Sequence, residues 1–179
     1  MRRVFVDASA FITLAAIGRG DLLHDLEGRV EIPATVQAEI IDEPAASTLA
    51  NAVDRKPVWI RTSSDPPREA VSTAAAQLGE ETPEGSPPGD VALLAHGLEA
   101  EDPVIVTDDK PLRKTCKALG IPVSGAIGVL IAAVERGDLE ADEAKEALVA
   151  MDKVGARLSA SLLRRAERLI DEAAGSDRS

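Results

Sequence analysis

Short apolar runs alternate with amphipathic segments along the first part of the chain. Residues 3–6 (RVFV) form a run too short for a helix, and the sequence then changes to helical periodicity over residues 7–18. Residues 29–32 (RVEI) repeat this pattern before Pro33, a residue well suited to the start of a helix. The pattern therefore predicts two successive strand–helix units, the second with its helix over residues 34–41.

The middle of the chain is less regular. A short helix is predicted at 45–54 and a strand at 56–61, after which five prolines interrupt residues 62–89. One helix, at 68–78, is predicted within this polar stretch. We interpret the stretch as a loop region and not as a domain boundary.

The strand–helix pattern resumes after the loop region. A helix is predicted over 90–100, followed by a strand in the segment PVIVTDD, a helix over 110–120 and a short strand in the segment IPVSG. The rest of the chain is helical in pattern, over residues 124–136, 140–151 and 159–174.

The alternation of strands and helices predicts an α/β fold. Parallel strands need crossover connections, so the expected architecture is a central parallel sheet with helices on both faces. We expect an α/β core over residues 1–137, a C-terminal helical extension over 138–175 packed on or beside the same domain, and a polar tail over 176–179. Sites in such sheets lie at the carboxyl ends of the strands.

Composition narrows the class of protein. The chain has 179 residues, of which 45% are hydrophobic but only 2% aromatic, so a single aliphatic core is expected. The one cysteine, Cys116, excludes a disulfide framework and a CxxC metal site, and His24 and His96 lack the spacing of zinc ligands. The N-terminus lacks the long apolar core of a signal peptide, and no apolar run reaches the ~20 residues of a membrane helix. We therefore expect a cytoplasmic protein without a membrane partner.

The formal net charge of −11 has two interpretations. Polyanion binding normally relies on Lys and Arg, so the acid excess could mean that the protein never touches nucleic acid. Alternatively, the excess is a halophile-like surface adapted to a salt-rich cytoplasm, where ions screen repulsion. We favour the second interpretation because several acids stand in places that a surface role does not explain.

Those acids follow predicted strands or lie on the helices beside them. Asp7 comes directly after VFV, and Asp108 and Asp109 follow VIVT, positions where an unpaired charge is costly. Glu39 lies on the helix predicted after the second strand, and Asp90 at the start of the helix before VIVT. If these side chains converge, a bound cation or raised pKa values must relieve their repulsion. Oxygen ligands of this kind suit Mg²⁺ or Mn²⁺.

Each of these acids also has a simpler interpretation. The four aspartates could be helix N-caps, and Glu39 could be a solvated helix residue. The order of the acids along the chain favours a joint metal-binding or catalytic role. It is a strand followed by Asp, a helix with Glu, a helix with Asp, and a strand followed by Thr-Asp-Asp.

The segments that carry these acids resemble the four acidic motifs of PIN domains. They are VDASAFITL, PATVQAEI, GDVALLA and VTDDKPLR, in the same order and at similar spacing. The closing segments IPVSGAIGVLIAAVERG and VGARLSASLLRRAERLIDEA further resemble a poorly characterised prokaryotic PIN subfamily of predicted nucleic-acid-binding proteins. The resemblance spans residues 3–173 and implies a three-layer α/β/α PIN-like fold with extra C-terminal helices.

The resemblance implies roles for residues in the first three motifs. Asp7 and Ser9 match the first motif, in which Ser9 is expected to hydrogen-bond within the acidic cluster. Glu39 matches the second motif. Asp90 stands where the third acid is found, although Glu is commoner there in this subfamily.

In the fourth motif, Thr107 matches the threonine of a Thr-x-Asp pattern, which fixes how the following residues align with the motif. Asp109 then matches the acid of that motif, and Asp108 becomes an auxiliary metal ligand or a hydrogen-bonding neighbour. The resemblance thus implies a Mg²⁺ or Mn²⁺ site, assisted by Asp108, with catalytic carboxylates at Asp7, Glu39, Asp90 and Asp109.

The activity implied by the resemblance is metal-dependent hydrolysis of RNA. Lys110, Arg113 and Lys114 could orient a phosphate, although they could equally form a solvated helix face. Toxins of toxin–antitoxin pairs are the nearest analogy, so a small antitoxin or a second copy of the chain is a candidate partner for the apolar faces of the last two helices. The arginines of residues 164–168 are expected to pair with the acidic surface or to contact such a partner.

Two other classes of protein remain open. A catalytically silent PIN module could bind nucleic acid or a protein while its acids hold a structural cation. A receiver-like phospho-acceptor also has acids at strand ends. Receivers, however, carry their acidic pair after the first strand, whereas Asp108 and Asp109 come late in this chain.

Overall fold

Five short parallel strands form the centre of the protein, whose computed structural model describes residues 1–176. Their order across the sheet is β3-β2-β1-β4-β5, and every pairing is parallel. The expected α/β fold with a parallel sheet is therefore confirmed. The strands span Arg3–Val6 (β1), Arg29–Pro33 (β2), Arg61–Ser63 (β3), Pro103–Val106 (β4) and Val123–Ser124 (β5).

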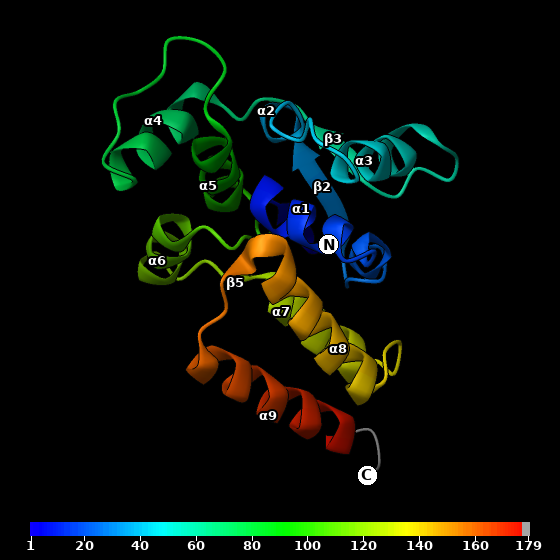
Figure 1. Cartoon of the computed structure of the whole chain (residues 1–179). Coiled ribbons are helices and arrows are strands. Elements are labelled where there is room, and N and C mark those ends of the chain that lie inside the picture. The colour runs from blue at the N-terminus through cyan, green and yellow to red at the C-terminus, as the bar shows by residue number, and fades with distance from the viewer. Residues whose placement is uncertain (177–179) are drawn as a thin grey trace.

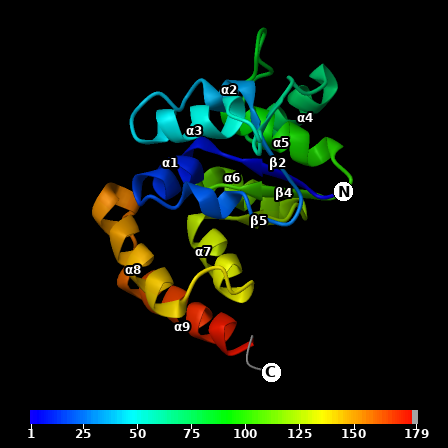
Figure 2. The ribbon, with the colours of Figure 1, turned by 90° about the vertical axis from the view of Figure 1, so that its right-hand side faces the viewer.

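Helices cover both faces of the sheet (Figures 1 and 2), which confirms the three-layer α/β/α architecture. One face carries α1 (Ala8–Ala16), α3 (Ala45–Asp54) and α7 (Ala126–Glu135), and the other carries α4 (Arg68–Gln77), α5 (Gly89–Glu99) and α6 (Lys110–Ala118). The core between these layers is mostly aliphatic, as the composition predicts. His96 on α5 belongs to it, because the ring is buried and stacks on Phe5 with centroids 5.0 Å apart.

The register of β1, at the middle of the sheet, brings together strand ends from distant parts of the chain. Val6 pairs with Val106 at the end of β4, and Asp7 N donates to Val106 O at 2.8 Å. Thr107 N donates in turn to Ser124 O at the end of β5, also at 2.8 Å. Asp7 and Thr107 therefore lie side by side at the carboxyl edge of the sheet, where parallel sheets place their sites.

Two helices follow α7 and lie beyond it, away from the sheet (Figure 1). α8 (Ala141–Met151) leads through the turn Asp152–Ala156 into α9 (Ala160–Ser176), which packs on both α7 and α8. The side chains of α9 that become buried are Ala166, Ile170 and Ala173. Within residues 1–176, no helix is both long and apolar enough to cross a membrane.

The strand predicted at 56–61 is wrong in its position, because β3 begins only at Arg61. The cause is a pair of hydrogen bonds to the preceding helix. Trp59 N and Ile60 N both donate to Ala52 O near the end of α3, at 3.2 and 3.3 Å. These amides point toward α3, so they do not pair with β2.

The helix predicted over residues 34–41 is also wrong in its length. α2 spans only Ala34–Gln37. Beyond it the backbone tightens to hydrogen bonds between residues three apart, such as Glu39 N to Val36 O at 3.1 Å. Glu39 therefore lies in a turn after α2 and not on a helix.

Candidate active site

Asp7 is the buried acid of the carboxyl edge, with only 8% of its surface exposed. Its Oδ1 accepts from Ala8 N at 2.8 Å, which makes Asp7 the N-cap of α1. Its Oδ2 accepts from the hydroxyls of Thr107 at 2.6 Å and Ser9 at 3.0 Å. These charge-assisted hydrogen bonds offset the cost of burying the carboxylate and hold it in one orientation.

The Thr107 hydroxyl connects the ends of β1 and β4. Thr107 is fully buried, and its Oγ1 donates to Asp7 while it accepts from Asp109 N at 3.1 Å. Ser9 Oγ accepts from Asp108 N, also at 3.1 Å. Two hydroxyls therefore fix the backbone of the Asp108–Asp109 pair relative to Asp7.

The Asp108 carboxylate lies against the N-terminus of α7. Its two oxygens are 3.2 and 3.4 Å from Ala126 N, and Gly125 permits this approach because a Cβ there would overlap Asp108 Oδ1. The surface of Asp108 remains partly open to solvent, but protein atoms crowd the carboxyl group. Burial, and then the negative charge of Asp7, raise the pKa of Asp108, whereas Ala126 N–H and Arg113 oppose the rise.

The Asp109 carboxylate takes a different direction. Its Oδ1 accepts from Leu112 N at 2.9 Å, so Asp109 is the N-cap of α6. The two adjacent aspartates therefore accept hydrogen bonds from the first turns of two different helices.

Glu39 and Asp90 lie at the same edge as Asp7, Asp108 and Asp109. We call these five carboxylates the acidic edge. Gly89 N, in the first turn of α5, donates to the Glu39 carboxylate, while Asp90 Oδ1 accepts from Val91 N at 2.8 Å. Burial, and then the charges of Asp7 and Asp90, raise the pKa of Glu39 against the opposing effect of the Gly89 N–H. The negative charges of both Asp7 and Asp90 therefore act on the Glu39 carboxyl group.

One acid of this edge was missed in the sequence. Glu80 hydrogen-bonds to the Asp90 side chain, and burial followed by the Asp90 charge raises its pKa. Its position follows from the end of α4, where Gly79 adopts a φ of 74° and Glu80 N donates to Ala75 O at 2.8 Å. Glycine after a helix signals such a turn, but not which acid the turn will meet.

These carboxylates share one edge without forming a ready-made cation cage. Within residues 1–176, no three His, Cys, Asp or Glu side chains lie close enough together to hold a metal ion as they stand. Glu39 and Asp108 direct their oxygens to the Gly89 and Ala126 amides instead. The donor set nevertheless fits Mg²⁺ or Mn²⁺ in its chemistry, because all its ligands are carboxylate oxygens that repel one another.

Comparison with known families identifies the family of the chain. A model described as a PIN domain matches residues 3–172, nearly the whole chain. The chain belongs to the PIN-domain family. No significant match is found among curated proteins. PIN domains are generally nucleases that use divalent metal ions, so the acidic edge is the candidate active site.

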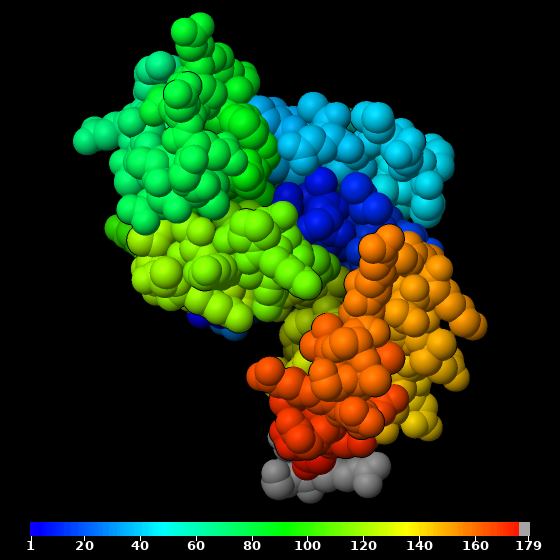
Figure 3. Space-filling model, turned by 60° about the vertical axis from the view of Figure 1, so that its left-hand side comes forward, coloured from blue at the N-terminus to red at the C-terminus, as the bar shows by residue number. Residues whose placement is uncertain are grey.

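Of the three basic residues predicted to orient a phosphate, Lys110 and Arg113 lie near the acidic edge, in a cleft that Lys114 does not line. Arg113 is half-buried, donates to Thr107 O at 2.9 Å and lies beside Asp108. Lys110 and Arg113 line a cleft of about 560 Å³ that also reaches Ser9 and Asp108, whereas Lys114 does not line it. The surface is hollowed in this region, where yellow-green α6 faces the orange residues after α8 (Figure 3).

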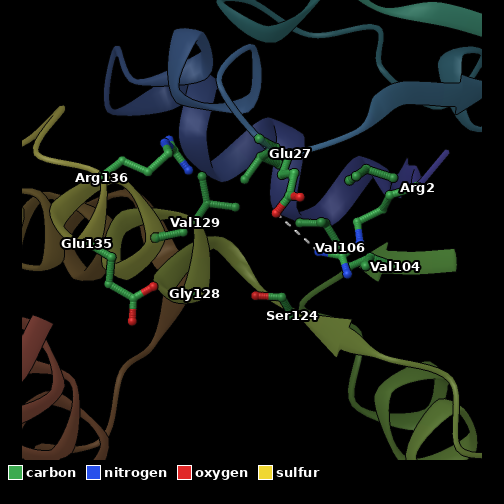
Figure 4. Close-up of a pocket in the computed structure, with 12 residues that line it drawn as sticks. Arg2, Glu27, Val104, Val106, Ser124, Gly128, Val129, Glu135 and Arg136 are labelled. Atoms are coloured by element: carbon green, nitrogen blue, oxygen red, sulfur yellow. Dashed lines mark ion pairs between the residues drawn. The ribbon is translucent and has the colours of Figure 1, made fainter. Parts of the chain in front are cut away.

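A second cavity, of about 330 Å³, lies on the α7 side of the sheet of the PIN domain (Figure 4). Its walls are largely apolar and include Val104 and Val129. Its charged groups include Arg2 and Glu27, which pair at 3.6 Å. None of the acids of the carboxyl edge lines this cavity, so it is not the candidate active site.

Proposed function

We propose that this PIN domain is a divalent-cation-dependent ribonuclease that hydrolyses phosphodiester bonds of RNA. The observation that carries the proposal is the mutual repulsion at the carboxyl edge. Burial is the main reason that the pKa values of Glu39 and Asp108 are raised, and the negative charge of Asp7 raises both further, with Asp90 adding to the effect at Glu39. Gathering like charges in this way costs the fold stability, and a bound divalent cation would offset that cost.

In this proposal the acids of the edge hold the cation. The ligands are drawn from Asp7, Asp90 and Glu39 together with Asp108, Asp109 or both. When bound, the cation supplies an activated water and stabilises the leaving oxygen. Thr107 and Ser9 keep the Asp7 carboxylate in one orientation through their hydroxyls. To hold a cation, Glu39 and Asp108 would give up their hydrogen bonds to the Gly89 and Ala126 amides.

A narrower proposal concerns the biological role. A toxin of a toxin–antitoxin pair would need a surface for a small antitoxin, and the last two helices are candidates. Leu148 and Met151 are 1% exposed and complete the core, but Val149 and Leu162 are 51% and 40% exposed. The same exposed side chains could serve a homodimer.

A catalytically silent PIN module is the second candidate function. It is favoured by the helix-capping roles of the acids, because Asp7, Asp109 and Asp108 each satisfy amides at the start of a helix. Such a module would bind Mg²⁺ without turnover. Calorimetric Mg²⁺ binding in a protein that leaves RNA intact would support it.

Cleavage of a labelled structured RNA with Mg²⁺, with Mn²⁺ and with EDTA tests the ribonuclease proposal. Asp7→Asn is expected to lower the cleavage rate on the order of 10²-fold or more, because a buried ligand loses its charge. Asp54→Asn, at an exposed site at the end of α3, is the matched control and should cleave like the wild type. Cleavage in EDTA, or an Asp7→Asn variant that cleaves normally, would overturn the proposal.

A further inference from the structure

The cleft beside the acidic edge has walls from two distant parts of the chain. One wall combines α6 and the start of α7 with two residues of the candidate active site, Ser9 of α1 and Asp108 just before α6. The other wall consists of the turn after α8 and the first half of α9, from Ala156 to Leu169. The last helices therefore do more than cover α7, because they close a cleft that reaches Asp108. The hollow between α6 and the residues after α8 is visible in Figure 3.

The charge of this cleft is opposite to that of the chain. The whole sequence has 31 acidic and 20 basic residues. Among the lining residues within 1–176, in contrast, the only acid is Asp108, and the basic side chains are Lys110, Arg113, Lys117, Arg157 and Arg165. The concentration of positive charge is therefore local, and the composition of the chain does not explain it.

Most of these basic groups are not used in ion pairs. Elsewhere in the protein, arginines such as Arg3 and Arg29 pair with carboxylates at 2.8 and 2.6 Å. Within residues 1–176, no carboxylate lies within 4.0 Å of the charged groups of Lys117, Arg157 or Arg165. Unpaired cations facing one another across a cleft repel, so an anionic ligand would stabilise the arrangement.

The backbone at Arg157 is strained in a way that suggests a function. Its φ of 49° and ψ of 60° are left-handed, a conformation that residues other than glycine rarely adopt. The turn is closed by Leu158 N, which donates to Asp152 Oδ1 at 3.1 Å. Glycine would suit this position better for folding alone. An arginine there places a cation on the cleft wall, and strained residues of this kind concentrate at functional sites.

We propose that this cleft binds the phosphate backbone of single-stranded RNA and leads it to the acidic edge, with Arg157 and Arg165 contributed by the C-terminal helices. The proposal rests on the proposed ribonuclease function and adds a substrate track to it. Basic grooves that follow the backbone are typical of proteins that bind single strands. The apolar wall residues Ile127, Leu158 and Leu162 offer surface to exposed bases, which a duplex would keep stacked inside.

Fluorescence anisotropy with a labelled single-stranded oligouridylate, in EDTA, measures this binding without cleavage or metal. The Arg157→Gln/Arg165→Gln variant is expected to bind about ten-fold or more weakly. Its plot of log K against log salt should be shallower by roughly 1.4, since each phosphate contact on a single strand contributes about 0.7.

The matched control is Lys153→Gln/Arg164→Gln. It removes the same charge from the same turn and helix, but neither residue lines the cleft. It should bind close to the wild type. Equal weakening in both pairs would overturn the proposal in favour of diffuse attraction. Unchanged binding in the cleft variant would also overturn it, as expected if the cleft instead receives a protein partner.

Arg157→Gly separates binding from folding. Glycine suits the left-handed conformation, so this variant should be at least as stable to urea as the wild type and still bind RNA more weakly. The cleft and the nuclease can also fail separately. Normal cleavage by Asp7→Asn would refute the nuclease while leaving the EDTA binding result intact. Wild-type binding by Arg157→Gln/Arg165→Gln would refute the cleft alone.

Discussion

At the scale of the residue, hydrogen bonds decide how each buried carboxylate behaves. Asp7 and Glu31 are both almost fully buried, with 8% and 3% of their surfaces exposed. Glu31 receives two bonds from Arg3 and one from Arg29, whereas Asp7 receives hydroxyl and backbone donors and no cation. Glu31 is thus a paired structural acid, whereas within residues 1–176 the Asp7 carboxylate has hydrogen-bond donors but no ion pair.

Glu31 gives a prediction for stability against pH. Burial alone would raise its pKa, but hydrogen bonds from Arg3, Ser63 and Arg29 outweigh it and lower the pKa from 4.5 to about 2. The charged form therefore favours the folded state. Glu31→Gln should lower the free energy of unfolding by about 2–3 kcal/mol at pH 7.

The sign of the shift sets the pH window of this effect. A lowered pKa contributes stability above pH 4.5, and that contribution is lost as the pH falls toward about 2. Urea unfolding of the wild type and Glu31→Gln should therefore show a gap that closes between these limits. A gap that stays constant down to pH 2 would contradict the prediction.

At the scale of the element, helix starts organise the acidic edge. Glu39 meets the first turn of α5, Asp108 meets that of α7, and Asp109 begins α6. Helix N-termini favour negative charge, which makes these contacts stable even without a cation. The periodicity of the sequence predicts where the helices begin. Which acid contacts each helix N-terminus depends on how the connecting turns pack.

Gly89→Ala tests how closely Glu39 must approach α5. A Cβ at Gly89 would come 2.6 Å from Glu39 Oε1, so the Glu39 side chain has to move. The free energy of unfolding should change by no more than about 1 kcal/mol, because alanine suits a helix and Glu39 ends in a flexible group. Mg²⁺-dependent RNA cleavage should fall roughly ten-fold or more, as expected when a ligand loses its orientation.

The matched variant for this experiment is Gly85→Ala. Gly85 lies in the preceding loop, and a Cβ there meets no atom within 4 Å. It should cleave RNA like the wild type. If Gly89→Ala did so too, the position of Glu39 would be irrelevant to the reaction.

At the scale of the whole molecule, the acidic edge and the basic cleft lie next to each other in a chain of net charge −11. The net negative charge of the chain is unfavourable for binding a polyanion. The cleft, in contrast, is lined mostly by basic side chains, so it favours one. Lysines and arginines from α6 and from the last helices meet only after folding. Net charge therefore describes the surface as a whole and not the surface that a ligand meets.

Mg²⁺ should stabilise the folded molecule if the acids bind it. At a Mg²⁺ concentration near 100 times its Kd, the gain of about 2.7 kcal/mol should raise the Tm by roughly 5–10 °C. Asp7→Asn should lose most of this shift, whereas Asp54→Asn should keep it. Differential scanning fluorimetry against NaCl of equal ionic strength measures the effect. Equal shifts with both salts would show screening alone.

The sequence by itself determined the layers, the parallel sheet and the place of the acids. Strand and helix periods are local properties, and Asp7 and Thr107 follow the buried strands β1 and β4. Residues in those positions reach the same edge once the two strands join one parallel sheet. The motifs also resembled the PIN family, which the match over residues 3–172 confirms.

Only the tertiary structure decided which side chains meet. Asp108 accepts from the first amide of α7 and Asp109 from the first turn of α6, although the two are neighbours with the same chemistry. Glu80 reaches Asp90 from a loop, and Arg165 joins the cleft from a distant helix. These contacts depend on loop closure and packing between remote segments, for which the local pattern of hydrophobic and polar residues has no signal.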